Sequence, residues 1–180
     1  MKKRLVTTQP ISREAAVSKL ETALGKVCCS ASFLEEDDDN TVVKICLTDR
    51  TDLYKPREAT PDERTAQLLV DCHFLLGGPW RLSNVNGRFS SWRVPRSVDP
   101  SGCNGIKRLE GRDIVGLAVS PQGFDLTLSF SDGYTLNNFC DSTIGDLELS
   151  ATWTFFDWKH NLMVQARLGL IGHRVFGLPE

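Results

Sequence analysis

The sequence has no long apolar segment. No run approaches the roughly 18 consecutive apolar residues that a membrane-spanning helix requires. Lys2, Lys3 and Arg4 resemble the start of a signal peptide, but the polar stretch Thr7–Pro10 follows where an apolar core would be needed. These absences lead us to expect a soluble, cytoplasmic protein that does not engage a membrane.

Motifs for metals, cofactors and catalysis are also lacking. The three histidines, His73, His160 and His173, include no pair with His-x-x-x-His spacing, and no cysteine pair has Cys-x-x-Cys spacing. There is no phosphate-binding glycine loop and no Gly-x-Ser-x-Gly nucleophile turn. We therefore expect no metal, no cofactor and no catalytic residues that a motif would identify. An enzyme whose site gathers distant residues, such as Cys140, Asp157 and His160, is kept as a third alternative.

The six cysteines are an even number, which in an exported protein would suggest disulfides. Without an export signal we expect reduced thiols. Cys28, Cys46, Cys72 and Cys140 lie in or beside apolar runs, where cysteine packs as a small hydrophobic residue. Cys72 and His73 could act as a thiol and its base, but the sequence favours an ordinary helix face.

The charge is unevenly distributed around a formal net charge of −2, which gives no overall attraction for nucleic acid. One acidic run consists of Glu35, Glu36, Asp37, Asp38 and Asp39. It lacks the ligand spacing of a calcium loop and falls between two predicted strands. We expect this solvated loop to contact a protein partner, because clustered carboxylates accelerate encounter with a basic surface.

Basic residues dominate the segment 81–112, and aromatic residues alternate with arginines over 80–96. Trp80, Arg88, Trp92 and Arg93 are the candidate nucleic-acid-binding residues, because proteins hold single strands with stacked aromatics and basic side chains. The simpler interpretation, which we favour, places the aromatics in the core and the arginines in water.

The strongest fold signal is a hairpin. Apolar residues alternate over Ile114–Val119 and Leu126–Phe130, and Asp132-Gly133 forms a turn before Leu136. Alternation at every second position predicts antiparallel strands with one buried face. Leu126, Leu128 and Phe130 should lie on that face with Leu136 opposite.

Capping residues predict two helices. Ser12 caps a helix whose apolar stripe runs over Val17–Val27. Thr60–Glu63 contains a capping box with proline in the first helical position, which predicts a helix over about 61–76. This second helix would carry His73 on its apolar face.

The remaining apolar runs predict strands. They are Ser30–Leu34, Thr41–Thr48, Trp80–Val85, Gly87–Val94, Thr152–Phe156 and a looser alternation over Met163–Phe176 with possible bulges at Gly169 and Gly172. We predict a single α+β domain over 1–180, in which two helices pack on a largely antiparallel sheet with a C-terminal β-meander. Residues 1–58 would form a helix and a hairpin, 60–78 a helix, and 79–180 the antiparallel region.

Residues from about 109 to 158 resemble a group of small, uncharacterised bacterial β proteins. The likeness lies in Leu109–Ile114, in Leu126–Leu136 and in Trp153–Phe156. Some of these proteins are similar to immunity proteins of toxin–immunity systems. The resemblance implies a binding role and supplies no catalytic residue.

These observations rank three classes of function. The first is non-enzymatic binding of a protein partner, such as an immunity-type protein that occludes a toxin, with the acidic run as a contact. Nucleic-acid binding through 80–96 is the alternative, and an enzyme with an unrecognised site is the third.

Overall fold

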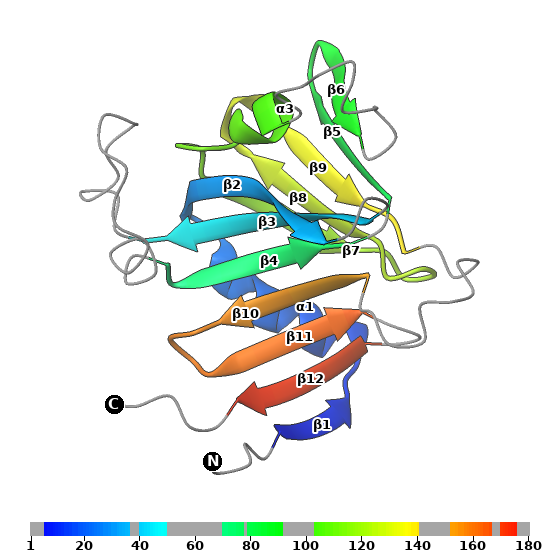
Figure 1. The fold of residues 1–180 in the computed structure, drawn as a ribbon. Helices are drawn as coiled ribbons and strands as arrows, with labels where there is room; N and C mark the ends of the chain where they lie inside the picture. The colour runs from blue at the N-terminus through cyan, green and yellow to red at the C-terminus, as the bar shows by residue number, and fades with distance from the viewer. Residues whose placement is uncertain are drawn as a thin grey trace.

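Two antiparallel sheets and one helix make up most of the structure, a computed structural model (Figure 1). It describes residues 6–36, 40–49, 70–77, 79–91, 103–140, 152–166 and 170–175. Every strand pair in both sheets is antiparallel. Within these ranges, no helix has the length and apolar character needed to cross a membrane.

The larger sheet has seven strands. In spatial order they are β1 (Val6–Pro10), β12 (Leu170–Val175), β11 (Leu162–Ala166), β10 (Trp153–Asp157), β4 (Cys72–Leu76), β3 (Asn40–Thr48) and β2 (Val27–Glu36). The second sheet has five. They are β6 (Gly87–Ser91), β5 (Trp80–Asn84), β9 (Thr135–Asn138), β8 (Leu126–Phe130) and β7 (Ile114–Val119).

The start of β2 joins the two sheets at one corner. Gly25 N donates to Ile114 O at 2.8 Å, and Ile114 N donates to Lys26 O at 3.0 Å. Cys28 N donates to Arg112 O at 2.8 Å. The chain therefore enters the larger sheet while still bonded to the segment that leads into β7.

The first predicted helix is real but shorter than expected. In α1 (Arg13–Leu20), the Ser12 hydroxyl accepts a hydrogen bond from Ala15 N at 3.1 Å, which confirms the N-cap. A 3₁₀ turn follows over Glu21–Ala23, and Gly25 then takes a φ of +75°. The α-helix has already ended at Leu20 and Leu24 is extended, with a ψ of 137°, so the prediction that the helical stripe reaches Val27 is wrong.

The second predicted helix is wrong over its C-terminal part. Cys72–Leu76 is strand β4, which lies between β3 and β10 in the larger sheet, and the segment 61–69 lies outside the described residues. A short apolar run fits either a helix or a buried strand, and here both neighbours supply backbone partners. The other described helix, α3 (Cys103–Lys107), is a single short turn within the region predicted to be β. The α+β class holds only coarsely: the helices are few, and two sheets replace the one expected.

The predicted hairpins are confirmed. β2 pairs with β3, and β5 pairs with β6 as far as Ser91. Leu128 pairs with Leu136 across β8 and β9, and both side chains are buried. The turn spans Ser131–Gly133 and contains the predicted Asp132-Gly133. Gly133 has a φ of +72°, and a Cβ there would meet Val85 Cγ1 at 2.8 Å, so the turn requires glycine.

The bulge predicted at Gly172 is wrong. Gly172 pairs in register with Val164 on one side and with Gln9 on the other. A Cβ at this position would meet Ile11 Cγ2 at 3.0 Å, so the glycine admits close packing of Ile11. Gly169 lies outside the described residues.

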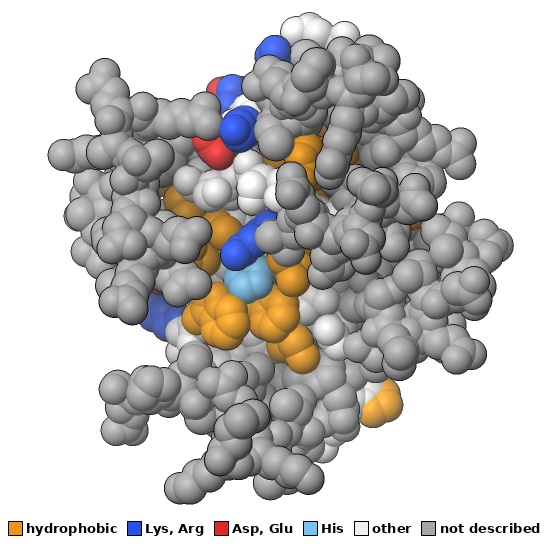
Figure 2. Space-filling view, viewed as in Figure 1, with side chains coloured by type: hydrophobic (Ala, Val, Ile, Leu, Met, Phe, Trp, Pro, Cys, Tyr) orange, Lys and Arg blue, Asp and Glu red, His pale blue; other side chains and the backbone are white. Residues whose placement is uncertain are grey.

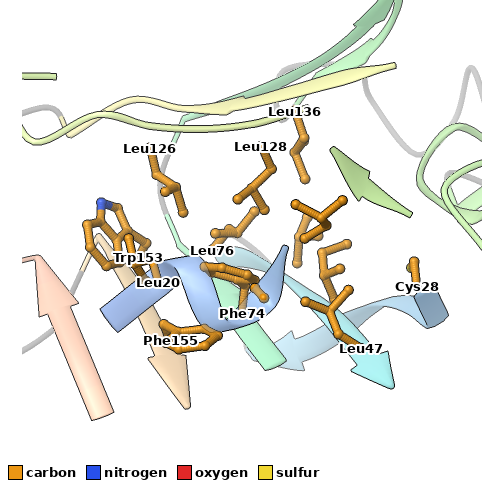
Figure 3. Close-up of a cluster of buried hydrophobic side chains, with 14 of the residues drawn as sticks. Leu20, Cys28, Leu47, Phe74, Leu76, Leu126, Leu128, Leu136, Trp153 and Phe155 are labelled. Carbon is orange, nitrogen blue, oxygen red and sulfur yellow. The ribbon is translucent and has the colours of Figure 1, made fainter. Parts of the chain in front are cut away.

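The core fills the space between the two sheets and α1. The larger sheet has an inner face toward this core and an outer face, which Figure 2 shows. In Figure 3, three leucines of the smaller sheet point toward residues of the larger sheet, with Leu20 of α1 beside them. These residues are Leu126, Leu128, Leu136, Phe74, Leu76, Trp153 and Phe155. The burial of these apolar side chains holds the two sheets together.

Candidate functional site

The outer face of the larger sheet carries apolar side chains that the core does not use. On β4 and β10, side chains alternate between the two faces, so His73 and Leu75 point away from the core, as do Thr154 and Phe156. His73 pairs with Phe156, and Phe156 pairs with Met163. These three residues therefore form one row across β4, β10 and β11.

Three of the outer-face residues form an aromatic cluster: His73, Phe156 and Trp158, the last from the turn after β10. The centroid of the His73 ring lies 4.6 Å from that of Phe156 and 5.3 Å from that of Trp158. Phe156 and Trp158 stack with centroids 5.4 Å apart and planes at 13°. Trp158 is 36% exposed whereas His73 is 7% exposed. Figure 2 shows hydrophobic side chains gathered around a histidine on this face.

A hydrogen bond fixes the cluster. Trp158 Nε1 donates to His73 Nδ1 at 3.1 Å. Since Nδ1 accepts, a neutral His73 carries its proton on Nε2. Burial, and to a smaller extent the positive charge of Lys44, lowers the pKa of His73 to about 4. At neutral pH the cluster is therefore uncharged and held in one arrangement.

We expect His73 to make stability depend on pH. Its pKa is about 4 in the folded protein against an ordinary value of 6.5. As pH falls below 6.5 the unfolded chain takes up the proton first, so the free energy of unfolding decreases until pH reaches about 4. The shift corresponds to about 3 kcal/mol. Above pH 6.5 this contribution is fully present.

Urea denaturation across this pH range, compared with His73→Gln, measures the effect. Glutamine does not titrate and can still accept the Trp158 hydrogen bond. The wild type should lose about 3 kcal/mol more than the variant on acidification. Parallel curves for the two proteins would contradict the buried, neutral state of His73.

Charged residues lie at the edge of the outer face. Lys44 of β3 pairs with Leu75, and its neighbour Cys46 pairs with His73. Lys26 Nζ lies 3.4 Å from Asp49 Oδ2, which is 3.7 Å from Lys159 Nζ. Within the described ranges Lys44 forms no ion pair, although it lies beside the aromatic cluster.

The candidate catalytic residues are only partly brought together. Asp157 is 3% exposed, and its Oδ2 lies 2.7 Å from His160 Nδ1. Cys140 contacts Phe124 O at 3.1 Å, near the Trp153 end of β10. Trp153 is four residues before Asp157 on β10, which is a distance of roughly 13 Å along a strand. The three side chains therefore do not form one site.

Five cysteines are free thiols with suppressed reactivity. They are Cys28, Cys29, Cys46, Cys72 and Cys140. The sixth, Cys103, begins α3, and nothing is described of its side chain. Burial raises the pKa of each of the five free thiols, to about 12 for Cys29 and about 11 for Cys140. Cys72, which pairs with Asp157 across the sheet, has its pKa raised as well. A protonated thiol is a poor nucleophile, so this arrangement does not favour cysteine catalysis.

The proposed nucleic-acid-binding residues do not form a described stacking surface. Trp80 is 2% exposed and faces the core, where its ring centroid lies 5.8 Å from that of Phe33. Trp80 therefore fits the favoured interpretation, in which the aromatics lie in the core, and is not placed to stack on bases. Arg88 lies in β6, and nothing is described of its side chain, while Trp92 and Arg93 lie outside the described residues.

The acidic run is only partly described. Glu35 and Glu36 end strand β2, and Asn40 begins β3 on the other side of the run. Asp37, Asp38 and Asp39 lie outside the described residues, and no side-chain geometry is described for any of the five acids.

Sequence reasoning missed the aromatic cluster. The sequence pattern predicts His73 on a helix and Phe156 at the end of the strand Thr152–Phe156, without assigning Phe156 to a face. The spacing of residues in Trp153–Trp158 could have revealed the cluster. Side chains alternate between the faces of a strand, so Phe156 and Trp158, two residues apart, lie on the face opposite Phe155.

In the described ranges, no three His, Cys, Asp or Glu side chains are grouped so that they could hold a metal ion. No protein-family model, curated protein or solved structure matches the chain. The candidate site therefore rests on the geometry of the outer face.

Proposed function

We propose that this protein is a non-enzymatic binding module that docks a protein partner on the aromatic cluster. The observation that carries the proposal is the exposure of Trp158, which lies on the outer face of the sheet and is already fixed by stacking and by its bond to His73. Tryptophan is enriched among residues that dominate binding energy. A side chain that is already ordered loses little entropy when a partner docks.

An immunity-type protein that occludes a toxin is the particular form we propose. Its support is the resemblance over residues 109–158, a segment that ends on Phe156 and Trp158 of the aromatic cluster. Occlusion needs complementary surface rather than catalytic residues. The acidic run Glu35–Asp39 would supply a second contact, to a basic part of the same toxin.

Substitution of the aromatic cluster tests docking directly. Tagged wild type and tagged Trp158→Ala are purified from the cells that produce them, and any proteins that stay bound are identified. Each bound protein is then purified and titrated against the wild type and the variant. We expect Trp158→Ala to weaken a true partner about 30-fold, since a central tryptophan contributes roughly 2 kcal/mol or more. Val115→Ala is the matched control, because Val115 is a 63% exposed apolar side chain on the smaller sheet.

A partner that binds both variants as tightly as wild type would contradict docking on the aromatic cluster. Recovery of nucleic acid alone, lost at high salt, would instead support the alternative function. For the immunity-type form, the identified partner should be toxic to cells, and co-production of wild type should restore growth where Trp158→Ala does not.

A further inference from the structure

On the outer face, the row of paired residues next to the aromatic cluster contains one charged side chain. Across the sheet, Ser32 pairs with Lys44, Lys44 with Leu75, Leu75 with Thr154, and Thr154 with Gln165. The two polar residues farthest along the row are already satisfied, because Gln165 Nε2 donates to Thr154 Oγ1 at 3.3 Å. Lys44 is therefore a cation flanked by uncharged and apolar neighbours.

The ammonium of Lys44 lies close enough to the cluster to act on it. Its charge lowers the pKa of His73 and opposes the burial that raises the pKa of Cys46. Both residues belong to the adjacent row of the same face. A ligand that covers the aromatic cluster would therefore also approach Lys44.

Two acids at one end of this face, Asp49 and Asp71, are already engaged by described residues. Lys26 Nζ lies 3.4 Å from Asp49 Oδ2 and 3.8 Å from Asp71 Oδ2, and Lys159 pairs with Asp49 as well. Asp71 Oδ2 also accepts a hydrogen bond from Asp49 N at 2.7 Å. These pairings keep both carboxylates at one end of the sheet, away from Lys44.

We infer that the docked partner presents an acidic side chain next to an apolar one, with its carboxylate on Lys44 and its apolar side chain on the aromatic cluster. This inference rests on the proposed function and names the chemistry of its partner. A partner without a counter-charge would strip the water from the lysine ammonium and replace it with nothing. The free-energy cost of burying such an unpaired charge is high. A carboxylate supplies a charge-assisted hydrogen bond instead. One cation matches one protein carboxylate, whereas a nucleic-acid backbone requires several.

The probe is hydrocinnamate, which joins a phenyl ring to a carboxylate, and its control is the neutral amide of the same acid. Binding to the full chain is followed by NMR, through the Trp158 indole N–H and the Lys44 backbone amide. Hydrocinnamate should shift both signals with a millimolar dissociation constant, and the amide should bind about five-fold more weakly. Lys44→Met, which keeps an apolar stem, should remove this preference, whereas Lys19→Met on α1 should keep it.

The outcomes separate the inference from the proposed function. Equal binding of the acid and the amide at Trp158 would overturn the inference and leave apolar docking intact. Failure of both probes to shift Trp158 would overturn both. Micromolar binding of hydrocinnamate alone would point to a small-molecule site and contradict a protein carboxylate as the ligand. Retained acid preference in Lys44→Met would assign the contact to another cation and overturn the inference.

Discussion

Phe155→Ala should lower the free energy of unfolding by about 3–5 kcal/mol, as expected for a large buried aromatic residue. The Phe155 side chain is fully buried in the core, with its ring centroid 4.7 Å from that of Phe74 (Figure 3). Truncation leaves a cavity that the two sheets cannot close, because both are fixed by their strand pairing. Chemical denaturation monitored by tryptophan fluorescence measures the loss.

The adjacent residue is the matched control. Phe156 points to the outer face and packs against His73 and Trp158. Phe156→Ala should therefore cost much less stability, about 1 kcal/mol, while it disturbs the aromatic cluster. A larger loss from Phe156→Ala than from Phe155→Ala would mean that the faces of β10 are exchanged, and the docking proposal would fail with them.

Leu128→Ala should cost about 2–5 kcal/mol, the second large effect. Leu128 is fully buried in the middle of β8 and pairs with Leu136 on β9 and with Leu117 on β7. Its neighbour Thr127 lies on the opposite face, where Oγ1 donates to Asn137 Oδ1 at 2.9 Å. Thr127→Ala should cost about 1 kcal/mol, the contribution of one ordinary hydrogen bond.

Equilibrium urea unfolding of the two variants compares them directly. A one-residue shift of strand pairing would exchange the two faces of β8. Comparable destabilisation at both positions would therefore reject the register of the hairpin.

Local signals predicted the smaller sheet well. The alternation in Leu126–Phe130 and the glycine at position 133 encode strand, face and turn within a dozen residues. The N-cap at Ser12 was equally local. The path of the chain after α1 was harder to predict, because Gly25 N there bonds to the distant Ile114 O.

The larger sheet and its outer face depend on pairing between distant segments. Cys72–Leu76 is a strand because β3 and β10 lie on either side of it, a fact that no window around residue 72 contains. The aromatic cluster then joins His73 to Phe156 and Trp158, more than eighty positions along the chain. The sequence shows that these aromatic residues are present, but the order of strands in the sheet determines that they lie together.

The first described strand pairs with the last: Val6 of β1 faces Val175 of β12 (Figure 1). During synthesis, β1 leaves the ribosome long before β12, its hydrogen-bonded neighbour among the described strands, exists. The seven-stranded sheet has high contact order, and closing such long loops early is entropically costly. The nearest-neighbour pairs β2–β3 and β5–β6 can form as hairpins while the chain grows. The edge formed by β1 is thus the part of the sheet that assembles after translation has passed residue 175.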